Sequence, residues 1–145
     1  VGYASYGYLF TVESDGGLYA TNVNTGVWIP IGKPEFANTR YFFEANGNLY
    51  SIEKDGSLYE INESSGNWRQ IGKPGEWVNT IAGTILDNKL YTIEKSGGLF
   101  VTDLLSGNWQ QLGKPEFGNT RFLVAAKGKL YTIETSGSLY EINVY

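Results

Sequence analysis

The chain contains no cysteine, no histidine and no methionine among its 145 residues. Without cysteine and histidine it has no thiolate or imidazole to bind zinc, no thiol nucleophile and no Ser–His–Asp triad. It also has no disulfide, so cysteine usage says nothing about the redox compartment. The chain begins with Val1 rather than methionine, which is compatible with processing of a secreted protein, and we expect a secreted or extracellular location.

Positive charge is scarce as well, with 11 Lys and Arg against 15 Asp and Glu and a net charge of −4. Because no basic stretch offers an electrostatic footprint for a phosphate backbone, we expect no nucleic-acid partner. No apolar run approaches the roughly 20 residues that cross a bilayer, so we expect no membrane insertion. No Asp-x-Asp-x-Asp-Gly loop is present, and we expect neither a metal nor another cofactor.

Aromatic residues and glycine, by contrast, are abundant. The chain has eleven Tyr, seven Phe and four Trp, which make aromatics 15% of the residues, together with 19 Gly. Aromatic residues favour strands and glycine favours tight turns, so this pairing indicates short strands joined by turns. Apolar residues at helical spacing are absent, and Gly or Pro interrupts the sequence too often for a helix. We therefore expect an all-β protein.

The most informative feature is an internal repeat. Ile-Gly-Lys-Pro occurs at 31–34 and 71–74 and returns as Leu-Gly-Lys-Pro at 112–115, at spacings of 40 and 41 residues. Two further series keep the same period, one of Leu-Phe or Leu-Tyr from Leu9 onward and one from Leu18 onward. A period of this length is typical of propellers and solenoids.

One repeat, residues 41–80, shows the anatomy of the unit. We expect four strands in it, at 41–45, 49–53, 57–61 and 67–71, because each is a short apolar or alternating run closed by turn residues. The first turn, Asn46-Gly47, is a dipeptide suited to a hairpin with positive φ. Four strands and three tight turns make an antiparallel meander.

Four-stranded units of about 40 residues predict a β-propeller, in which each sheet packs face to face on the next. We expect a single propeller over residues 1–145, with blades at 1–40, 41–80 and 81–121 and a partial blade at 122–145 that lacks its outer strand. A β-prism or an open solenoid is the alternative.

The partial blade would leave residues 139–144 as an uncovered sheet edge, and proteins usually cover such edges. We therefore expect a homodimer, in which two chains pair their arrays into a larger ring. The alternatives are a short ring that tolerates a three-stranded blade, or a fragment of a longer array.

The repeat also resembles the blades of tachylectin-2, a β-propeller lectin, and more distantly the tectonin-type propeller lectins. The resemblance covers essentially the whole chain at low stringency and rests on an Asn-Trp pair, an Ile-Gly or Leu-Gly pair, an aromatic, and then Leu-Tyr. The matching residues are Asn67-Trp68, Ile71-Gly72, Trp77, Leu90-Tyr91, Asn108-Trp109, Leu112-Gly113, Phe117, Phe122-Leu123 and Gly128 to Tyr131.

This resemblance implies a propeller fold and binding of N-acetylated hexosamines. The chain departs from the family after the Ile-Gly pair. Where tachylectin-like blades carry Gly-Gly-Trp, this chain has Pro34-Glu35-Phe36, Pro74 to Trp77 and Pro115-Glu116-Phe117. The loop nearest the family's sugar sites is therefore rebuilt.

Successive strands of a blade run in opposite directions. Two motifs, the loop between blades and the turn after the second strand, therefore lie at the same end of a blade. Sugar binding needs aromatic surfaces and hydrogen-bonding carboxylates and amides, and these motifs contain both. The expected aromatic platforms are Trp77, Phe36 and Phe117. The expected hydrogen-bonding groups are Asn38, Asn79 and Asn119 with Glu53, Glu94 and Glu134, and Glu13 holds the equivalent place in the first repeat.

A structural role is the alternative for these residues, since Asn-Thr often caps a turn and an aromatic often fills the gap between blades. We expect Trp28, Trp68 and Trp109, which open the fourth strands, to pack between blades.

An enzymatic function is not expected. Propeller glycosidases need paired carboxylates at the axis, and the first strands of the four repeats supply only Glu44. The leading hypothesis is a multivalent, non-catalytic carbohydrate-binding protein whose partners are glycans. The alternatives are a protein–protein interaction scaffold, or a designed or fragmentary repeat protein without a native ligand.

Overall fold

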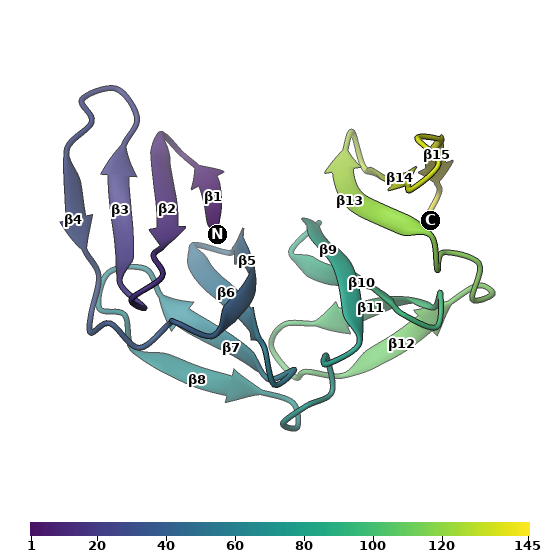
Figure 1. Ribbon diagram of the computed structural model, residues 1–145, viewed down its shortest axis with the longest axis horizontal. Helices are drawn as coiled ribbons and strands as arrows, with labels where there is room; N and C mark the ends of the chain where they lie inside the picture. Colours follow the sequence, from purple (N-terminus) through teal and green to yellow (C-terminus); the bar gives the residue numbers. More distant parts are fainter. The chain divides into compact units, whose positions relative to one another are not determined.

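The structure, a computed structural model, describes residues 1–145 and contains fifteen β-strands and no helix. Strands that are consecutive in the chain form four antiparallel meanders, three of four strands and one of three (Figure 1). These sheets are the blades of a β-propeller, so the predicted all-β propeller fold, including a last blade without its outer strand, is confirmed. The chain has no helical segment of the length and apolarity that a bilayer crossing needs.

The first compact unit, Val1–Gly75, holds two blades. Blade 1 consists of β1 (Gly2–Ser5), β2 (Tyr8–Val12), β3 (Leu18–Asn22) and β4 (Trp28–Pro30). Blade 2 consists of β5 (Thr39–Ala45), β6 (Asn48–Glu53), β7 (Leu58–Asn62) and β8 (Trp68–Ile71).

The second compact unit, Glu76–Tyr145, holds the other two. Blade 3 consists of β9 (Thr80–Leu86), β10 (Lys89–Glu94), β11 (Leu99–Asp103) and β12 (Trp109–Leu112). Blade 4 consists of β13 (Thr120–Ala126), β14 (Lys129–Glu134) and β15 (Leu139–Ile142).

The strands expected in residues 41–80 are all present, but the first strand of the blade begins earlier than its apolar run. In β5, Thr39 pairs with Glu53 and Tyr41 pairs with Ile52, so Arg40 stands in a β-bulge. The same early start recurs at Thr80 and Thr120. The first strands of blades 2, 3 and 4 therefore begin with a threonine opposite the last glutamate of the second strand.

The predicted hairpin at the β5–β6 turn is confirmed by its backbone. Asn46 and Gly47 have φ angles of 53° and 73°, the left-handed values that a tight hairpin turn requires. The N–H of Gly47 also donates to Oε1 of Glu44 at 3.0 Å, which closes the turn.

The core of the first unit lies between its two sheets. Side chains of β2 and β3, among them Phe10 and Leu18, cluster with Phe42, Leu49 and Ile61 of blade 2. Ser5 of β1 donates a hydrogen bond to Oε2 of Glu44 at 2.8 Å and so joins the first strands of the two blades.

The core of the second unit repeats this arrangement. Tyr91, Ile93 and Leu99 of blade 3 cluster with Leu123 and Leu130 of blade 4. In both units, one blade therefore covers the apolar face of the next, as the propeller architecture requires.

Candidate functional site

A cavity recurs at the same end of blades 2, 3 and 4. In each case the loop that leads into the blade forms one side, and the end of the second strand with the turn after it forms the other. The volumes are about 400 Å³ on blade 2, about 400 Å³ on blade 3 and about 600 Å³ on blade 4. These volumes are in the range of small-molecule sites in proteins.

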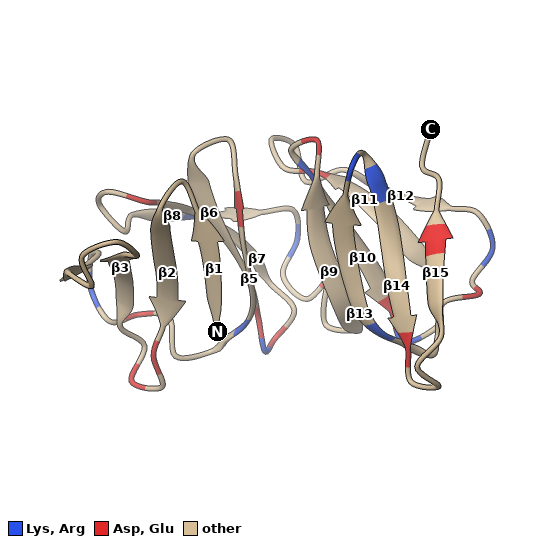
Figure 2. Ribbon diagram, turned by 90° about the horizontal axis from the view of Figure 1, so that it is seen from above, with Lys and Arg blue, Asp and Glu red and all other residues tan.

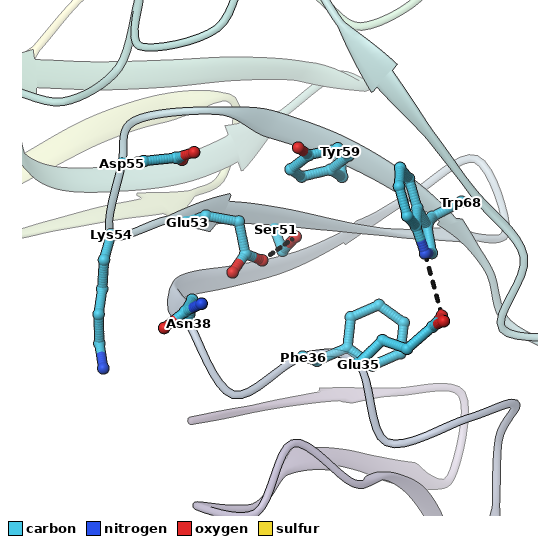
Figure 3. A pocket seen from close by; sticks show the side chains of 9 residues that line it. All are labelled: Glu35, Phe36, Asn38, Ser51, Glu53, Lys54, Asp55, Tyr59 and Trp68. Carbon is cyan, nitrogen blue, oxygen red and sulfur yellow. Dashed lines mark hydrogen bonds between the residues drawn. The ribbon is translucent and has the colours of Figure 1, made fainter.

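Figure 3 shows the blade 2 cavity, which contains aromatic, acidic and amide side chains together. It is lined by Glu35, Phe36, Asn38, Ser51, Glu53, Lys54, Asp55, Tyr59 and Trp68. The mixture of apolar rings with hydrogen-bonding groups suits a ligand that has both apolar and hydroxylated faces.

Backbone hydrogen bonds hold the loop against the blade. The carbonyl of Asn38 accepts from the N–H of Lys54 at 2.8 Å, and the carbonyl of Phe36 accepts from the N–H of Thr39 at 3.1 Å. Equivalent bonds join Asn79 to Lys95 and Asn119 to Thr135, both at 2.9 Å. The prediction that the loop and the turn lie at the same end of the blade is thus confirmed in blades 2, 3 and 4.

The recurrent glutamate is fixed by the threonine of the bulged first strand. Oε1 of Glu53 accepts hydrogen bonds from Oγ1 of Thr39 at 2.9 Å and from Oγ of Ser51 at 2.8 Å. Glu94 accepts from Thr80 and Glu134 from Thr120, each at 3.0 Å. These bonds orient the carboxylates at the cavity wall.

Burial raises the pKa of Glu53 above its usual value, because removal from water disfavours the charged carboxylate. The hydrogen bonds from Ser51 and Thr39 act in the opposite direction, since they stabilise the charged form. Burial is the larger effect.

A tryptophan on the fourth strand forms the aromatic wall. Trp68 meets Tyr59 edge to face, with ring centroids 5.0 Å apart and an interplanar angle of 81°. Its Nε1 donates to Oε2 of Glu35 in the loop at 3.1 Å, as Figure 3 shows. On blade 3 the same wall is built by Trp109, which donates to Glu76 at 3.4 Å.

The structure brings the predicted amides and carboxylates together. The amides, which line the three cavities one each, are Asn38, Asn79 and Asn119. The carboxylates, distributed in the same way, are Glu53, Glu94 and Glu134.

The three aromatic residues predicted as platforms also line the cavities, but two of them expose little of their rings. Phe36 and Trp77 are 4% and 3% exposed, and Phe117 packs against the core of the second unit. Phe36 belongs to the core cluster that joins blades 1 and 2. Phe36 and Trp77 therefore fill space between strands rather than standing open.

The open aromatic surfaces belong to residues that the sequence reading assigned to packing between blades. That assignment is corrected, because Trp28, Trp68 and Trp109 are 61%, 50% and 50% exposed. A usable signal was present in the sequence. The loop glutamate precedes the tryptophan by 33 residues in both Glu35–Trp68 and Glu76–Trp109.

Charges of the two signs are interspersed in both units, along the loops and the strand ends, with no field of one sign (Figure 2). No group of three or more Asp and Glu side chains is arranged to hold a metal ion.

The sequence matches no protein-family model and no curated protein. The structure, however, is similar to several solved propeller proteins. BamB from Moraxella catarrhalis aligns with a TM-score of 0.71 at 13% identity, over 98% of this chain and 43% of that chain. The chain therefore spans less than half the length of that protein.

Two further structures give the same result. The computationally designed Ika4 protein aligns with a TM-score of 0.68 at 14% identity, over 98% of this chain and 88% of its own. The N-terminal domain of Nup159 aligns with a TM-score of 0.63 at 12% identity, over 95% of this chain and 42% of its own. At such low identity these similarities establish the fold alone.

Proposed function

We propose that the protein is a multivalent, non-catalytic carbohydrate-binding protein that engages glycans outside the cell, with one shallow site in each of the three blade cavities. The observation that carries the proposal is the repetition of the same polar and aromatic cavity on three successive blades. In each cavity, the carboxylate that the threonine orients also offers a hydrogen-bond acceptor to a ligand.

The chemistry of the blade 2 cavity fits a pyranose ring. The ring of Trp68 is half exposed and its indole N–H is already engaged by Glu35, so its free surface is apolar and suits the C–H face of a sugar. Glu53 and Asn38 supply acceptors and donors for sugar hydroxyls.

Several weak sites on one chain would act together. Linking sites on one chain converts the second binding event into an intramolecular one, which can raise avidity by about 10² to 10⁴ without any new contact. The chain carries three similar cavities, so a branched or repeated glycan could engage more than one of them.

The resemblance to tachylectin-like blades supports N-acetylated hexosamines as the ligand class. The rebuilt loop has a specific place in this proposal, because Glu35 and Glu76 in that loop hold the tryptophan walls. The loop that departs from the family thus contributes to the same kind of pocket by a different set of contacts.

Catalysis is not part of the proposal. Glu44, the carboxylate of the first strands, accepts hydrogen bonds from Ser5 and from the N–H of Gly47. Both of its oxygens are therefore engaged in holding strands and a turn.

A glycan array with the intact chain tests the proposal. We expect micromolar or tighter binding to N-acetylated hexosamines and its reduction in Trp68→Ala. Trp28→Ala is the matched control, since Trp28 has the same edge-to-face partner type, Tyr19, but lines none of the three cavities. Silence across the array combined with capture of one defined protein partner would overturn the proposal in favour of an interaction scaffold.

We also propose, as the sequence suggests, that two copies of the chain associate. Blade 4 exposes apolar side chains on one face, with Phe122 at 51%, Val124 at 46% and Leu139 at 65%. Exposed apolar groups gathered on one sheet are typical of an interface. Light scattering should give twice the chain mass, and Phe122→Asp should return the monomer. A wild-type monomer over the micromolar range would contradict the association.

A further inference from the structure

The cavities of blades 2 and 3 share the loop and the glutamate at their rim. They differ at their base, which the second and third strands of the blade form. At the strand-two position that precedes the glutamate by two residues, blade 2 has Ser51 and blade 3 has Thr92. On the third strand, Tyr59 and Ile61 of blade 2 correspond to Phe100 and Thr102 of blade 3. Blade 3 therefore loses a phenol hydroxyl near the rim and gains an aliphatic hydroxyl at the base.

The base of the blade 3 cavity carries two buried hydroxyls without partners. Thr92 and Thr102 are both 0% exposed, both line the cavity, and Oγ1 of each makes no hydrogen bond. Ser51, by contrast, donates to Glu53 at 2.8 Å, and Ile61 belongs to the apolar core. A buried hydroxyl without a partner is unfavourable and uncommon in folded proteins.

The strand register places these two hydroxyls side by side. Thr92 pairs with Phe100, and Thr102 pairs with Leu90, so the two threonines are diagonal neighbours on one face of adjacent antiparallel strands. They lie deeper than Glu94, the last residue of the same strand, which lines the cavity as well. The two threonines therefore stand on the same face of the blade, at the base of the cavity that both line.

We propose that the blade 3 cavity binds a sugar by inserting one of its hydroxyl groups between Thr92 and Thr102, and that this makes its specificity different from that of blade 2. The inference rests on the proposed carbohydrate-binding function. The blade 2 cavity has no unpartnered hydroxyl at its base, because Ser51 already donates to Glu53 and the apolar Ile61 stands at the position of Thr102. The two sites of one chain thus read different groups of a sugar.

The experiment uses the intact chain, N-acetylglucosamine and the set of its monodeoxy analogues, each of which lacks one hydroxyl. The indole N–H signals of Trp68 and Trp109 report the two cavities separately in a two-dimensional NMR titration, because each ring lines only one of them. The double variant Thr92→Val/Thr102→Val removes both hydroxyls and keeps the side-chain shape.

We expect this variant to weaken binding at Trp109 by about tenfold or more and to leave binding at Trp68 unchanged, since a site built to bond a hydroxyl loses that contact. One monodeoxy analogue should bind the Trp109 site of the wild type more weakly than N-acetylglucosamine does. The double variant should bind this analogue as tightly as the wild type does, because the contact that the analogue lacks is already absent. The melting temperature of the variant should stay the same or rise, because the removed hydroxyls have no partner in the free protein.

Thr132→Val is the matched control. Thr132 is the blade 4 equivalent of Thr92, is 0% exposed and has an unpartnered Oγ1, but it lines none of the described cavities. This variant should leave both titrations unchanged.

The outcomes separate this inference from the proposed function. If neither indole signal responds to any sugar of a glycan array, the carbohydrate-binding function itself fails. If both respond and the double variant keeps full affinity at Trp109, only the inference about the blade 3 base is overturned. A variant with lower melting temperature and unchanged affinity would also overturn it, since the threonines would then serve a structural water.

Discussion

Blades 3 and 4 belong to the same unit and carry nearly the same second strand, yet their cavities differ. On blade 3, Trp109 packs edge to face on Phe100 and donates to the loop glutamate, and the cavity measures about 400 Å³. On blade 4 there is no fourth strand, Tyr140 is 55% exposed, and the cavity widens to about 600 Å³. The loop and the carboxylate therefore form one half of the site by themselves, and the outer strand supplies the aromatic half.

The largest expected effect concerns the turn after the second strand. Gly97 has a φ of +91°, and a Cβ there would lie 2.9 Å from the carbonyl oxygen of Pro115 and 3.0 Å from the N–H nitrogen of Gly118. Its blade 4 equivalent, Gly137, has a similar φ of +87° and no atom within 4 Å of a built Cβ. Both alanine variants suffer the same left-handed strain, and only Gly97→Ala also collides with the following loop.

Gly97→Ala should therefore lose about 2 kcal/mol more than Gly137→Ala in the free energy of unfolding. Urea denaturation of the two variants measures the difference. Equal losses would show that the loop moves away without cost and would break the comparison between the two blades.

The second prediction concerns the aromatic wall. Trp109→Ala should leave the blade 3 site with only its loop and its carboxylate, as on blade 4. The affinity of blade 3 for N-acetylglucosamine should therefore fall about tenfold, or ~1.4 kcal/mol, toward that of blade 4. The backbone amides of Lys95 and Thr135, which bond to the loop asparagines of the two blades, report the two sites in an NMR titration. Undiminished affinity in the variant would remove the aromatic wall from the binding site.

The smallest effect is the pH dependence of blade 2. Because burial raises the pKa of Glu53 above its ordinary 4.5, the folded state holds this proton more tightly than the unfolded state. Its contribution to stability is full below about pH 4.5 and is lost as pH rises through the raised pKa. Wild type should therefore lose stability over this range relative to Glu53→Gln, whose amide oxygen can still accept from Thr39 and Ser51.

Sugar affinity at Trp68 should change in the opposite sense and rise with pH, since the ionised carboxylate is the stronger acceptor. Thermal melts and titrations from pH 4 to pH 7 measure both trends. Glu63→Gln is the control, because it removes a carboxylate of the same unit that lines none of the cavities. Parallel pH curves for wild type and Glu53→Gln would contradict the assignment.

The fold was predictable because the residues that recur every 40 positions are the apolar residues of the strands and the Gly and Asn residues of the turns. The Asn46-Gly47 turn and the alternation in β6 can each be read locally, and both are present in the structure. The early start of the first strand was not predictable, because Thr39 lies before the apolar run and beyond a bulge. Strand periodicity does not encode such a bulge.

The candidate site was predictable in part. The carboxylates and amides follow from strand direction alone, which places Glu53 and Asn38 at one end of the blade. The expectation that Trp28, Trp68 and Trp109 pack between blades was wrong, because burial of a ring depends on which sheet covers it. Nothing in the local sequence distinguishes Trp77, which is 3% exposed, from Trp68, which is 50% exposed.

Each cavity takes its loop from the end of one repeat and its strands from the next, so the binding unit is offset from the folding unit by part of a period. Duplication of a repeat therefore creates a new junction between blades as well as a new sheet. The number of sites grows with the number of these junctions. A single isolated sheet of this kind has no such junction and therefore lacks a cavity of this type.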